Sequence, residues 1–324
     1  RSISTVFYKL RLDKAFLYGK AKEHKNIPFV KNRYIFYAVS ILIICIGLGT
    51  MGFNKENGNG YMNYSLDFVG GTATTVTFND NWTTEKLDEE VVPKIESTTG
   101  VKSVQVQTVS GTNQVVFKTT TLDVSQCEAM DSMLKTDYKV SEDNIAAETI
   151  SSTISNEATR DAISAMIIAL ILMLIYIWVR FKDLKFGASA IIALGHDALM
   201  VVTCYALTRI EVGGTFIAAV LTIIGYSIND TIVTFDRIRE NQHLISTDEQ
   251  RAELIDRSIT QTLSRSLFTS LTTFFMVLTL YVFGVADIKD FALPLMVGVI
   301  SGTYSSICIA SPLWFDMKKK RREN

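Results

Sequence analysis

Residues 221–233 read LTIIGYSINDTIV, an apolar run that carries a single acidic residue, Asp230. A carboxylate at the centre of a membrane helix costs about 2.5–3.5 kcal/mol on insertion scales. Such a residue usually serves an ion or proton pathway, and the alternative is a structural hydrogen bond to a neighbouring helix. We therefore expect Asp230 to be a functional residue inside a membrane helix.

The rest of the chain contains further segments long enough to cross a bilayer, which takes about 20 apolar residues. Six such segments lie near residues 34–52, 162–180, 186–207, 213–234, 266–286 and 290–313. The third carries His196 and Asp197 near its middle. The sequence therefore predicts an α-helical membrane protein with six transmembrane helices.

Basic residues indicate the orientation of these helices. Residues 1–33 contain nine Lys and Arg, and a run of Lys and Arg occupies 318–322. Further basic residues lie in the segments 180–185 and 235–265. With six spans, all four basic segments fall on one side of the membrane. Because Lys and Arg favour the cytoplasmic side, both termini are predicted to be cytoplasmic and the long segment after the first span external.

That external segment is predicted to be a small folded domain. The segment begins with two extended runs at 62–68 and 72–78, followed by a helix at 83–97. A hairpin over 101–117 and a helix at 123–134 come next, and residues 143–160 are expected to lead helically into the second span. A strand, helix, strand, strand, helix order, completed by a last strand, is typical of a ferredoxin-like α+β unit. Its sixteen Asp and Glu show no clustered ligand pattern, so we expect a solvated surface and no metal site.

The predicted organisation has five parts. These are a basic N-terminal segment (1–33), a first transmembrane helix (34–52), an external α+β domain (53–160), transmembrane helices two to six (161–313) and a basic tail (314–324). The N-terminal segment is expected to lie on the anionic inner leaflet as an amphipathic helix or to be a solvated lead. Because residue 1 is Arg, we expect a fragment, a processed product or half of a fusion.

Enzymatic chemistry is not indicated. The histidines are His24, His196 and His243, which cannot form a His-Glu-x-x-His zinc site, and no phosphate-binding glycine loop is present. The four cysteines lack zinc-type spacing, and only one lies in the external segment. We therefore expect no enzyme activity, no cofactor and no nucleic-acid partner.

Several motifs, taken together, resemble one family. Residues 65–72 read SLDFVGGT, and GYSINDTIV at 225–233 is followed by FDRIREN at 235–241. The segment 257–273 reads RSITQTLSRSLFTSLTT, and 195–197 read GHD. These motifs are similar to those of SecF proteins, and the resemblance extends over essentially the whole chain.

The resemblance implies half of a twelve-helix assembly of the RND transporter superfamily in the bacterial cytoplasmic membrane. SecF supplies six spans, and SecD, as a separate or fused chain, supplies six more. The pair uses the proton-motive force to assist late steps of protein export beside the SecYEG channel. The implied partners are SecD, SecYEG, unfolded exported proteins, protons and the lipid bilayer. A proton-coupled exporter of small molecules or lipids from the same superfamily is the alternative.

The resemblance also assigns a proton-relay role to Asp230 and Arg265. The two residues lie at similar depth, because Asp230 is near the inner end of span four and Arg265 begins span five from the same side. A pair that separates during a cycle can take up a proton in one state and release it in another.

Supporting residues of the relay are expected on the same two helices. Asn229 precedes the acid, and Thr269 and Thr272 share a face with Arg265, where they either carry water or pack helices. Asp197 is a second candidate, for a relay or for a structural hydrogen bond. Gly298 and Gly302, with neighbouring serines, predict a small-residue face on span six that packs closely on a partner helix.

Overall fold

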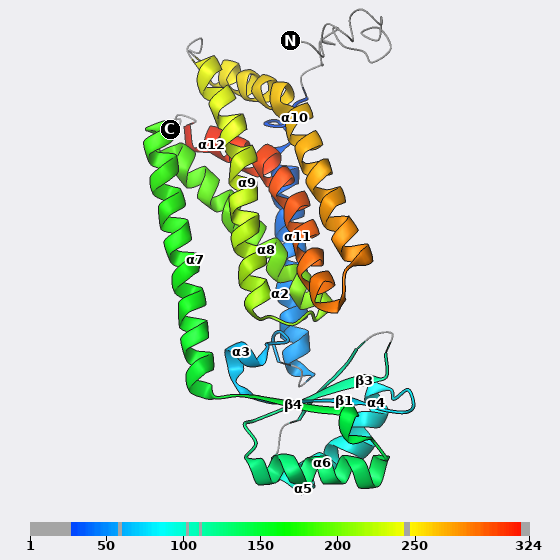
Figure 1. Ribbon diagram of the computed structural model, residues 1–324. Coiled ribbons are helices and arrows are strands. Elements are labelled where there is room, and N and C mark those ends of the chain that lie inside the picture. The colour runs from blue at the N-terminus through cyan, green and yellow to red at the C-terminus, as the bar shows by residue number, and fades with distance from the viewer. Residues whose placement is uncertain (1–26, 58–59, 102–103, 110–111, 243–246, 319–324) are drawn as a thin grey trace, which may run out of the picture.

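The computed structural model describes residues 27–57, 60–101, 104–109, 112–242 and 247–318, and the structural statements below concern these residues. The expected N-terminal amphipathic helix therefore lies almost entirely outside the described residues. The chain forms a long helical bundle with a small sheet domain, residues 60–150, at one end (Figure 1).

Six helical rods build the bundle, and each is long and apolar enough to cross a membrane. They are α2 (Arg33–Glu56), α7 (Ser152–Phe181), α8 (Leu184–Thr208), α9 (Gly214–Asn241), α10 (Asp248–Phe283) and a last rod made of α11 (Ala286–Ser305), η4 (Ser306–Ala310) and α12 (Ser311–Lys318). The six predicted spans are confirmed among the described residues. Each helix is longer than its apolar segment because polar ends continue it beyond the hydrocarbon thickness.

Three of the membrane helices, α7, α8 and α10, start where the sequence supplies side-chain caps. Ser151 accepts a hydrogen bond from the backbone N–H of Ile154 at the start of α7, and Asp183 caps α8. Thr247 and Gln250 form a capping box at the start of α10. Such caps satisfy N–H groups that the first helical turn leaves without partners.

The helices divide into central and peripheral ones. α8, α9 and the α11–α12 rod bury much of their apolar segments, whereas α2, α7 and α10 expose theirs. α7 runs along the outside of the bundle (Figure 1) and exposes Ile167, Ile171 and Leu172. Exposed apolar side chains are expected on helices that face lipid. Because polar side chains are costly in contact with lipid, they are expected in the middle of the bundle.

The sheet domain has the predicted ferredoxin-like arrangement. Its elements are β1 (Gly71–Thr77), α4 (Thr84–Lys86), η1 (Leu87–Val91), α5 (Val92–Thr99), β2 (Gln105–Thr108), β3 (Gln114–Thr119), α6 (Val124–Tyr138), η2 (Glu142–Asn144) and β4 (Ile145–Ile150). The strand order is β2-β3-β1-β4, and all three pairings are antiparallel. α5 and α6 cover the face away from the bundle (Figure 1), over a core that includes Phe117, Leu87 and Leu134.

Two local predictions in this domain are wrong. Residues 62–68 do not form a strand, since Tyr64 makes a single bridge and Leu66–Val69 is the short helix α3. Residues 145–150 do not lead helically into the second span but form β4, whose Thr149 pairs with Thr72 of β1. The helix propensity of the alanines in β4 is overridden because the open edge of β1 offers a row of hydrogen bonds.

A glycine pair lets the chain turn from α3 into the sheet. Gly70 and Gly71 have backbone φ angles of 68° and 124°, which residues other than glycine rarely adopt. A Cβ atom on Gly71 would lie 2.3 Å from the carbonyl oxygen of Thr119. The turn therefore needs glycine and brings β1 directly beside β3.

The sheet domain is fastened to the connection between α8 and α9. Tyr64 and Val212 form a parallel bridge, and the N–H of Val212 donates to the carbonyl oxygen of Asn63 at 2.7 Å. Lys118 Nζ of β3 lies 3.1 Å from Glu211 Oε1 and donates to Asn63 Oδ1 at 3.2 Å. The helix that carries Asp230 thus begins at a junction, residues 63–64, 118 and 211–212, that is bonded to the sheet domain.

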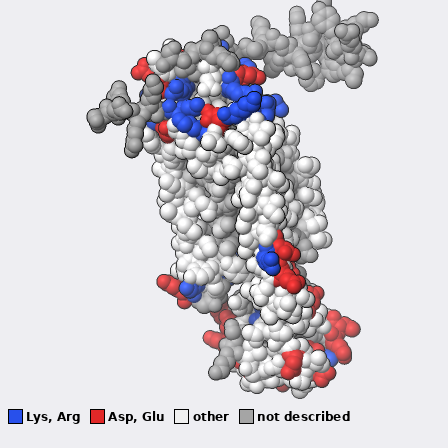
Figure 2. All heavy atoms as spheres, turned by 90° about the vertical axis from the view of Figure 1, so that its left-hand side faces the viewer, with Lys and Arg blue, Asp and Glu red and all other residues white. Residues whose placement is uncertain are grey.

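Charge is divided along the long axis of the molecule. Lys and Arg form a belt at the end of the bundle away from the sheet domain, whereas acidic residues scatter over the sheet domain (Figure 2). In the basic belt, Arg180 pairs with Asp236 at 2.7 Å and Arg237 pairs with Glu240 at 2.8 Å. Between the two ends the view in Figure 2 shows a broad band with almost no charged atoms.

Candidate functional site

Asp230 lies inside the bundle, where α9 packs against α10 and α11. Its side chain is buried, with 4% of the residue exposed. Ser270 of α10 donates a long hydrogen bond of 3.4 Å to Asp230 Oδ2. The hydroxyl of Ser266 on the same helix also faces the carboxylate, but two hydroxyls satisfy only part of a carboxylate, which offers about four acceptor positions. Asp230 is therefore a buried acid with few donors.

Ser270 is the meeting point of three helices. Tyr226 of α9 donates to Ser270 Oγ at 3.1 Å, and Thr303 of α11 donates to the same atom at 2.5 Å. Thr303 Oγ1 also lies 2.9 Å from the carbonyl oxygen of Val299, one turn earlier in its own helix. A hydroxyl has one proton, so Thr303 donates to only one of these two acceptors at a time.

Arg265 does not form a direct ion pair with Asp230 in the described part of the chain. The side chain of Arg265 is exposed on α10, although its positive charge acts on Asp230 electrostatically. The reason is the helical period: one residue corresponds to a rotation of about 100°. Ser266 and Ser270 share the buried face of α10, so Arg265 is turned away from it.

Asn229, Thr269 and Thr272 also lie on exposed faces of α9 and α10. Thr269 donates to the carbonyl oxygen of Arg265 and Thr272 to that of Thr269, each at 2.8 Å. Along α10 the structure brings Thr269 and Thr272 together with Arg265 on an outer face, and among the described contacts neither these residues nor Asn229 bonds to the carboxylate. Their proton-relay role remains a prediction.

Sequence reasoning missed Ser266 and Ser270, whose hydroxyls do face the acid, and Thr303, which donates to Ser270. A signal was present in the spacing. Ser266 and Ser270 are four residues apart, and the large apolar residues Leu267, Phe268 and Leu271 occupy other sides of α10. Small hydroxyl residues at i and i+4 mark the face of a membrane helix that packs on protein.

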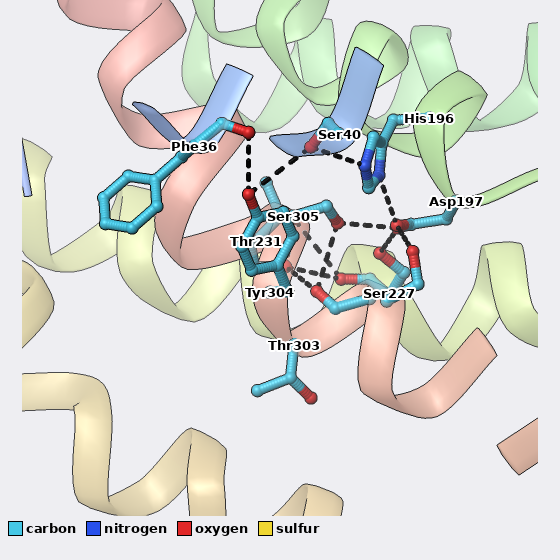
Figure 3. Close-up of polar contacts among 12 residues, drawn as sticks. Phe36, Ser40, His196, Asp197, Ser227, Thr231, Thr303, Tyr304 and Ser305 are labelled. Atoms are coloured by element: carbon cyan, nitrogen blue, oxygen red, sulfur yellow. Dashed lines mark hydrogen bonds and ion pairs between the residues drawn. The ribbon is translucent and has the colours of Figure 1, made fainter. Parts of the chain in front are cut away.

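Asp197 of α8 is also fully buried, but donors surround it (Figure 3). Oδ2 accepts from Ser227 of α9 at 2.5 Å and from Ser305 of α11 at 2.7 Å. Oδ1 accepts from Ser301 of α11 at 2.6 Å and lies 3.1 Å from His196 Nδ1. The carboxylate therefore joins α8, α9 and α11 by hydrogen bonds. This geometry agrees with the second of the two roles predicted for Asp197, a structural hydrogen bond between helices.

A polar chain continues from this acid to the first membrane helix (Figure 3). His196 Nε2 lies 3.0 Å from Ser40 Oγ of α2, and Ser40 lies 3.4 Å from the hydroxyl of Tyr304. Tyr304 in turn donates to the carbonyl oxygen of Phe36 at 2.8 Å. Through these contacts α2 is joined to α8 and α11 in the middle of the bundle.

Close approach of α11 to α9 depends on the small residues predicted on span six. A Cβ atom on Gly298 would lie 2.2 Å from Ile223, and one on Gly302 would lie 2.9 Å from Ser227. Thr231 and Ser306 share a hydrogen bond of 2.8 Å farther along the same contact. The small-residue face therefore packs on α9, which places Thr303 and Ser305 near the two acids.

The two acids and their hydroxyls make a polar centre without an evident metal site, because no group of three His, Cys, Asp or Glu residues is found within the described ranges. Such a centre can hold and release protons or bond helices together. A six-helix bundle with buried acids and one ferredoxin-like domain defines a multi-pass membrane protein of transporter type.

Comparisons with known proteins agree with this class. The family described as protein export membrane protein SecD/SecF, C-terminal, matches residues 129–320. The protein translocase subunit SecF of Sebaldella termitidis is 35% identical over 92% of this chain and 94% of its own length. The protein translocase subunit SecDF of Thermus thermophilus is 40% identical over 90% of this chain and 38% of its own.

Solved structures agree as well. A crystal structure of SecDF from Thermus thermophilus, described as a translocon-associated membrane protein, overlays with a TM-score of 0.77 at 33% identity. It covers 96% of this chain, which spans 41% of that longer one. SecDF in its super-membrane-facing form overlays with a TM-score of 0.63. The chain belongs to the SecD/SecF family of protein-export membrane proteins, with SecF subunits among its full-length relatives. The alternative of a small-molecule exporter receives no support.

Proposed function

We propose that this chain is the SecF half of a SecD–SecF pair that uses the proton-motive force to assist late steps of protein export. Asp230 is the group that takes up and releases the proton. One observation carries the proposal: Asp230 is buried between three helices, and among the described residues its carboxylate is faced by two serine hydroxyls, Ser266 and Ser270, the latter at 3.4 Å. A buried acid that lacks donors is poorly stabilised as an anion, so it exchanges a proton when its surroundings change.

Energy from the proton reaches the sheet domain through the junction. A proton that crosses the membrane yields about 2.3 kcal/mol per 100 mV, which is enough to bias a two-state motion. α9 carries Asp230 and starts beside Val212, which is bonded to Asn63 and thereby to Lys118 of the sheet. A shift of α9 is therefore transmitted to the domain that handles the exported chain.

The partner SecD covers the outer surface of α9 and α10. Asn229, Arg265, Thr269 and Thr272 are exposed there, and charged or polar groups are costly in contact with lipid. Contact with a second set of membrane helices relieves that cost. The same contact with SecD allows Arg265 to approach Asp230 during a transport cycle. Arg265 therefore keeps its proposed role in the proton relay.

The proposed location is the bacterial cytoplasmic membrane, with both termini in the cytoplasm and the sheet domain on the external face. The basic belt supports this orientation (Figure 2), because Lys and Arg favour the cytoplasmic side. The SecYEG channel and unfolded exported proteins complete the set of partners. The chain drives a mechanical step and performs no enzymatic reaction of its own.

The test uses the full chain with SecD and SecYEG in proteoliposomes, with export of a precursor measured with and without an imposed proton gradient. Asp230→Asn keeps size and polarity but cannot ionise. We expect it to assemble normally and to lose all of the gradient-dependent export. Asp161→Asn, at an exposed acid of α7, is the matched control and should behave as wild type. Full gradient stimulation in Asp230→Asn would refute the proposal.

A further inference from the structure

Two arginines of the basic belt meet where α7 packs against α9. Arg180 lies in the last turn of α7, and Arg239 lies in the last turn of α9. Arg239 Nη1 donates to the carbonyl oxygen of Arg180 at 2.9 Å. The guanidinium carbons of Arg180 and Arg239 lie 5.9 and 5.8 Å from the centroid of the Phe181 ring. Because Phe181 is buried, it gives both guanidinium groups a fixed apolar support.

Both arginines have unused hydrogen-bond donors. A guanidinium group has five N–H donors. In the described part of the chain, Arg180 donates to Asp236 Oδ2 at 2.7 Å, and Arg239 donates to one carbonyl oxygen. Both side chains are exposed. Their remaining N–H groups are therefore available to an acceptor from outside the chain.

Lys182 adds a third cation beside these arginines. It follows Arg180 by two residues at the end of α7, is exposed, and forms no ion pair with any residue that the structure describes. We call Arg180, Lys182 and Arg239 the cationic cluster. Asp236 is the acid bonded to it, so three cations and one carboxylate leave two net positive charges.

The neighbouring acids of both helix ends are paired with other cations. Asp183 lies 2.8 Å from Lys318 Nζ, and Glu240 lies 2.8 Å from Arg237 Nη1. Each of these pairs is neutral as a whole, so it changes the net charge of the cationic cluster little. The cluster is therefore attractive to an anion.

A lipid-facing apolar surface begins directly beside the cationic cluster. Ile175, Trp178 and Val179 are exposed on the last turns of α7 before Arg180. Trp is favoured at the level of the lipid headgroups, where its ring contacts both the apolar and the polar region. Cations and apolar surface thus follow one another along α7 in the order in which a phospholipid carries its phosphate and its acyl chains.

The cationic cluster lies away from the surface proposed for SecD. That surface includes Asn229 on α9 and Thr269 on α10, whereas α7 and α10 stand on opposite sides of α9 (Figure 1). Arg239 follows Asn229 by ten residues, which turns it by about 80° around the axis of α9. Its bond to Arg180 shows that this turn is toward α7. We therefore expect the cluster to face lipid while SecD is bound.

We propose that Arg180, Lys182 and Arg239 bind the phosphate of one anionic phospholipid, whose acyl chains lie along the exposed apolar face of α7. Guanidinium groups suit this ligand because they form paired, charge-assisted hydrogen bonds with phosphate oxygens. An anionic lipid is favoured over a zwitterionic one, because a zwitterionic headgroup brings its own cation beside three others. A lipid is favoured over free phosphate, because acyl chains add apolar contact.

The test uses native mass spectrometry to count the lipids bound to the full chain in complex with SecD. The probes are phosphatidylglycerol and phosphatidylcholine with identical acyl chains, each titrated into the complex in detergent. We expect one phosphatidylglycerol to bind about tenfold more tightly than phosphatidylcholine, because each basic residue near an anionic headgroup contributes to its affinity.

Variants locate the site. Arg239→Gln should weaken phosphatidylglycerol binding about fivefold, the effect of one basic residue, and should leave phosphatidylcholine binding unchanged. Arg239→Lys keeps the charge without the planar fork and should recover part of the loss. Arg257→Gln is the matched control, since Arg257 is an exposed arginine near the start of α10, and it should bind lipid as wild type. Gel filtration checks that each variant assembles with SecD.

The outcomes decide between one site and a diffuse attraction. Equal losses in Arg239→Gln and Arg257→Gln would show that the whole basic belt attracts lipid, which overturns the proposal. Equal binding of the two lipids overturns it as well. Excess glycerol phosphate should not displace the lipid, and displacement would assign the cluster to a soluble phosphate instead. Lipid binding requires no export, so this result is independent of the proposed function.

Discussion

Two buried aspartates lie close together in the bundle and differ in what surrounds them. Asp197 receives hydrogen bonds from three serines on two other helices at 2.5–2.7 Å and contacts His196. Asp230 is faced by two hydroxyls of α10, those of Ser266 and of Ser270, and the Ser270 contact is long at 3.4 Å. Both are almost completely buried. Burial alone therefore does not make an acid a proton carrier, and the number of donors around it decides its role.

The first prediction compares the two acids by removing each. Asp197→Ala leaves three serines and His196 without their shared acceptor, and each buried polar group left unsatisfied costs about 1–3 kcal/mol. Asp230→Ala removes only the contacts with Ser266 and Ser270 and should cost about 1–2 kcal/mol. Unfolding of the purified chain in detergent measures both. Equal losses of unfolding free energy would show that the two acids contribute equally to stability.

The second prediction converts one acid into the other. Ser301→Ala combined with Ser305→Ala removes two donors from Asp197, each contributing about 1.5–3 kcal/mol as a hydrogen bond to a charged group. Asp197 should then become labelled by a carbodiimide, which reacts with protonated carboxyl groups in apolar surroundings, as we expect for Asp230. Ser305→Ala alone should give an intermediate result. Absence of labelling in the double variant would argue that the donors do not set the difference.

The third and smallest effect concerns Arg265. Its exposed side chain acts on Asp230 only through space, so its influence is partly screened. Arg265→Gln should raise the labelling midpoint of Asp230, the pH at which it is half labelled, by less than about one pH unit. Arg265→Lys should leave the midpoint unchanged yet reduce gradient-stimulated export, because the planar fork is lost. Normal export in Arg265→Lys would assign the arginine a merely interfacial role.

Most of the fold was predictable because a bilayer imposes simple constraints. Apolar segments of sufficient length predict the spans, and all six helices are found near their predicted positions. The basic loops predict the orientation of these spans. The sheet domain follows from its order of strands and helices. A last strand was expected, but residues 145–150 were read as part of a helical lead, since their alanines favour helix locally and only the free edge of β1 decides for a strand.

The candidate site was predictable in its acids but not in their partners. Asp230 and Asp197 stand out because acids in apolar helices are rare. The partners depend on the rotation of each helix about its axis. The i, i+4 spacing of Ser266 and Ser270 marks one candidate inward face of α10, but Thr269 and Thr273 have the same spacing, so the sequence does not choose between the two faces. Packing against α9 and α11 selects the serines.

The most direct test of the central claim compares the two acids within one protein. The wild-type chain with SecD is exposed to a carbodiimide over a range of pH, and the modification of Asp197 and Asp230 is quantified peptide by peptide. We predict that Asp230 is labelled with a clear pH midpoint and that Asp197 remains unmodified throughout. Labelling of Asp197 with Asp230 unmodified, or identical titration of both residues, would contradict the account.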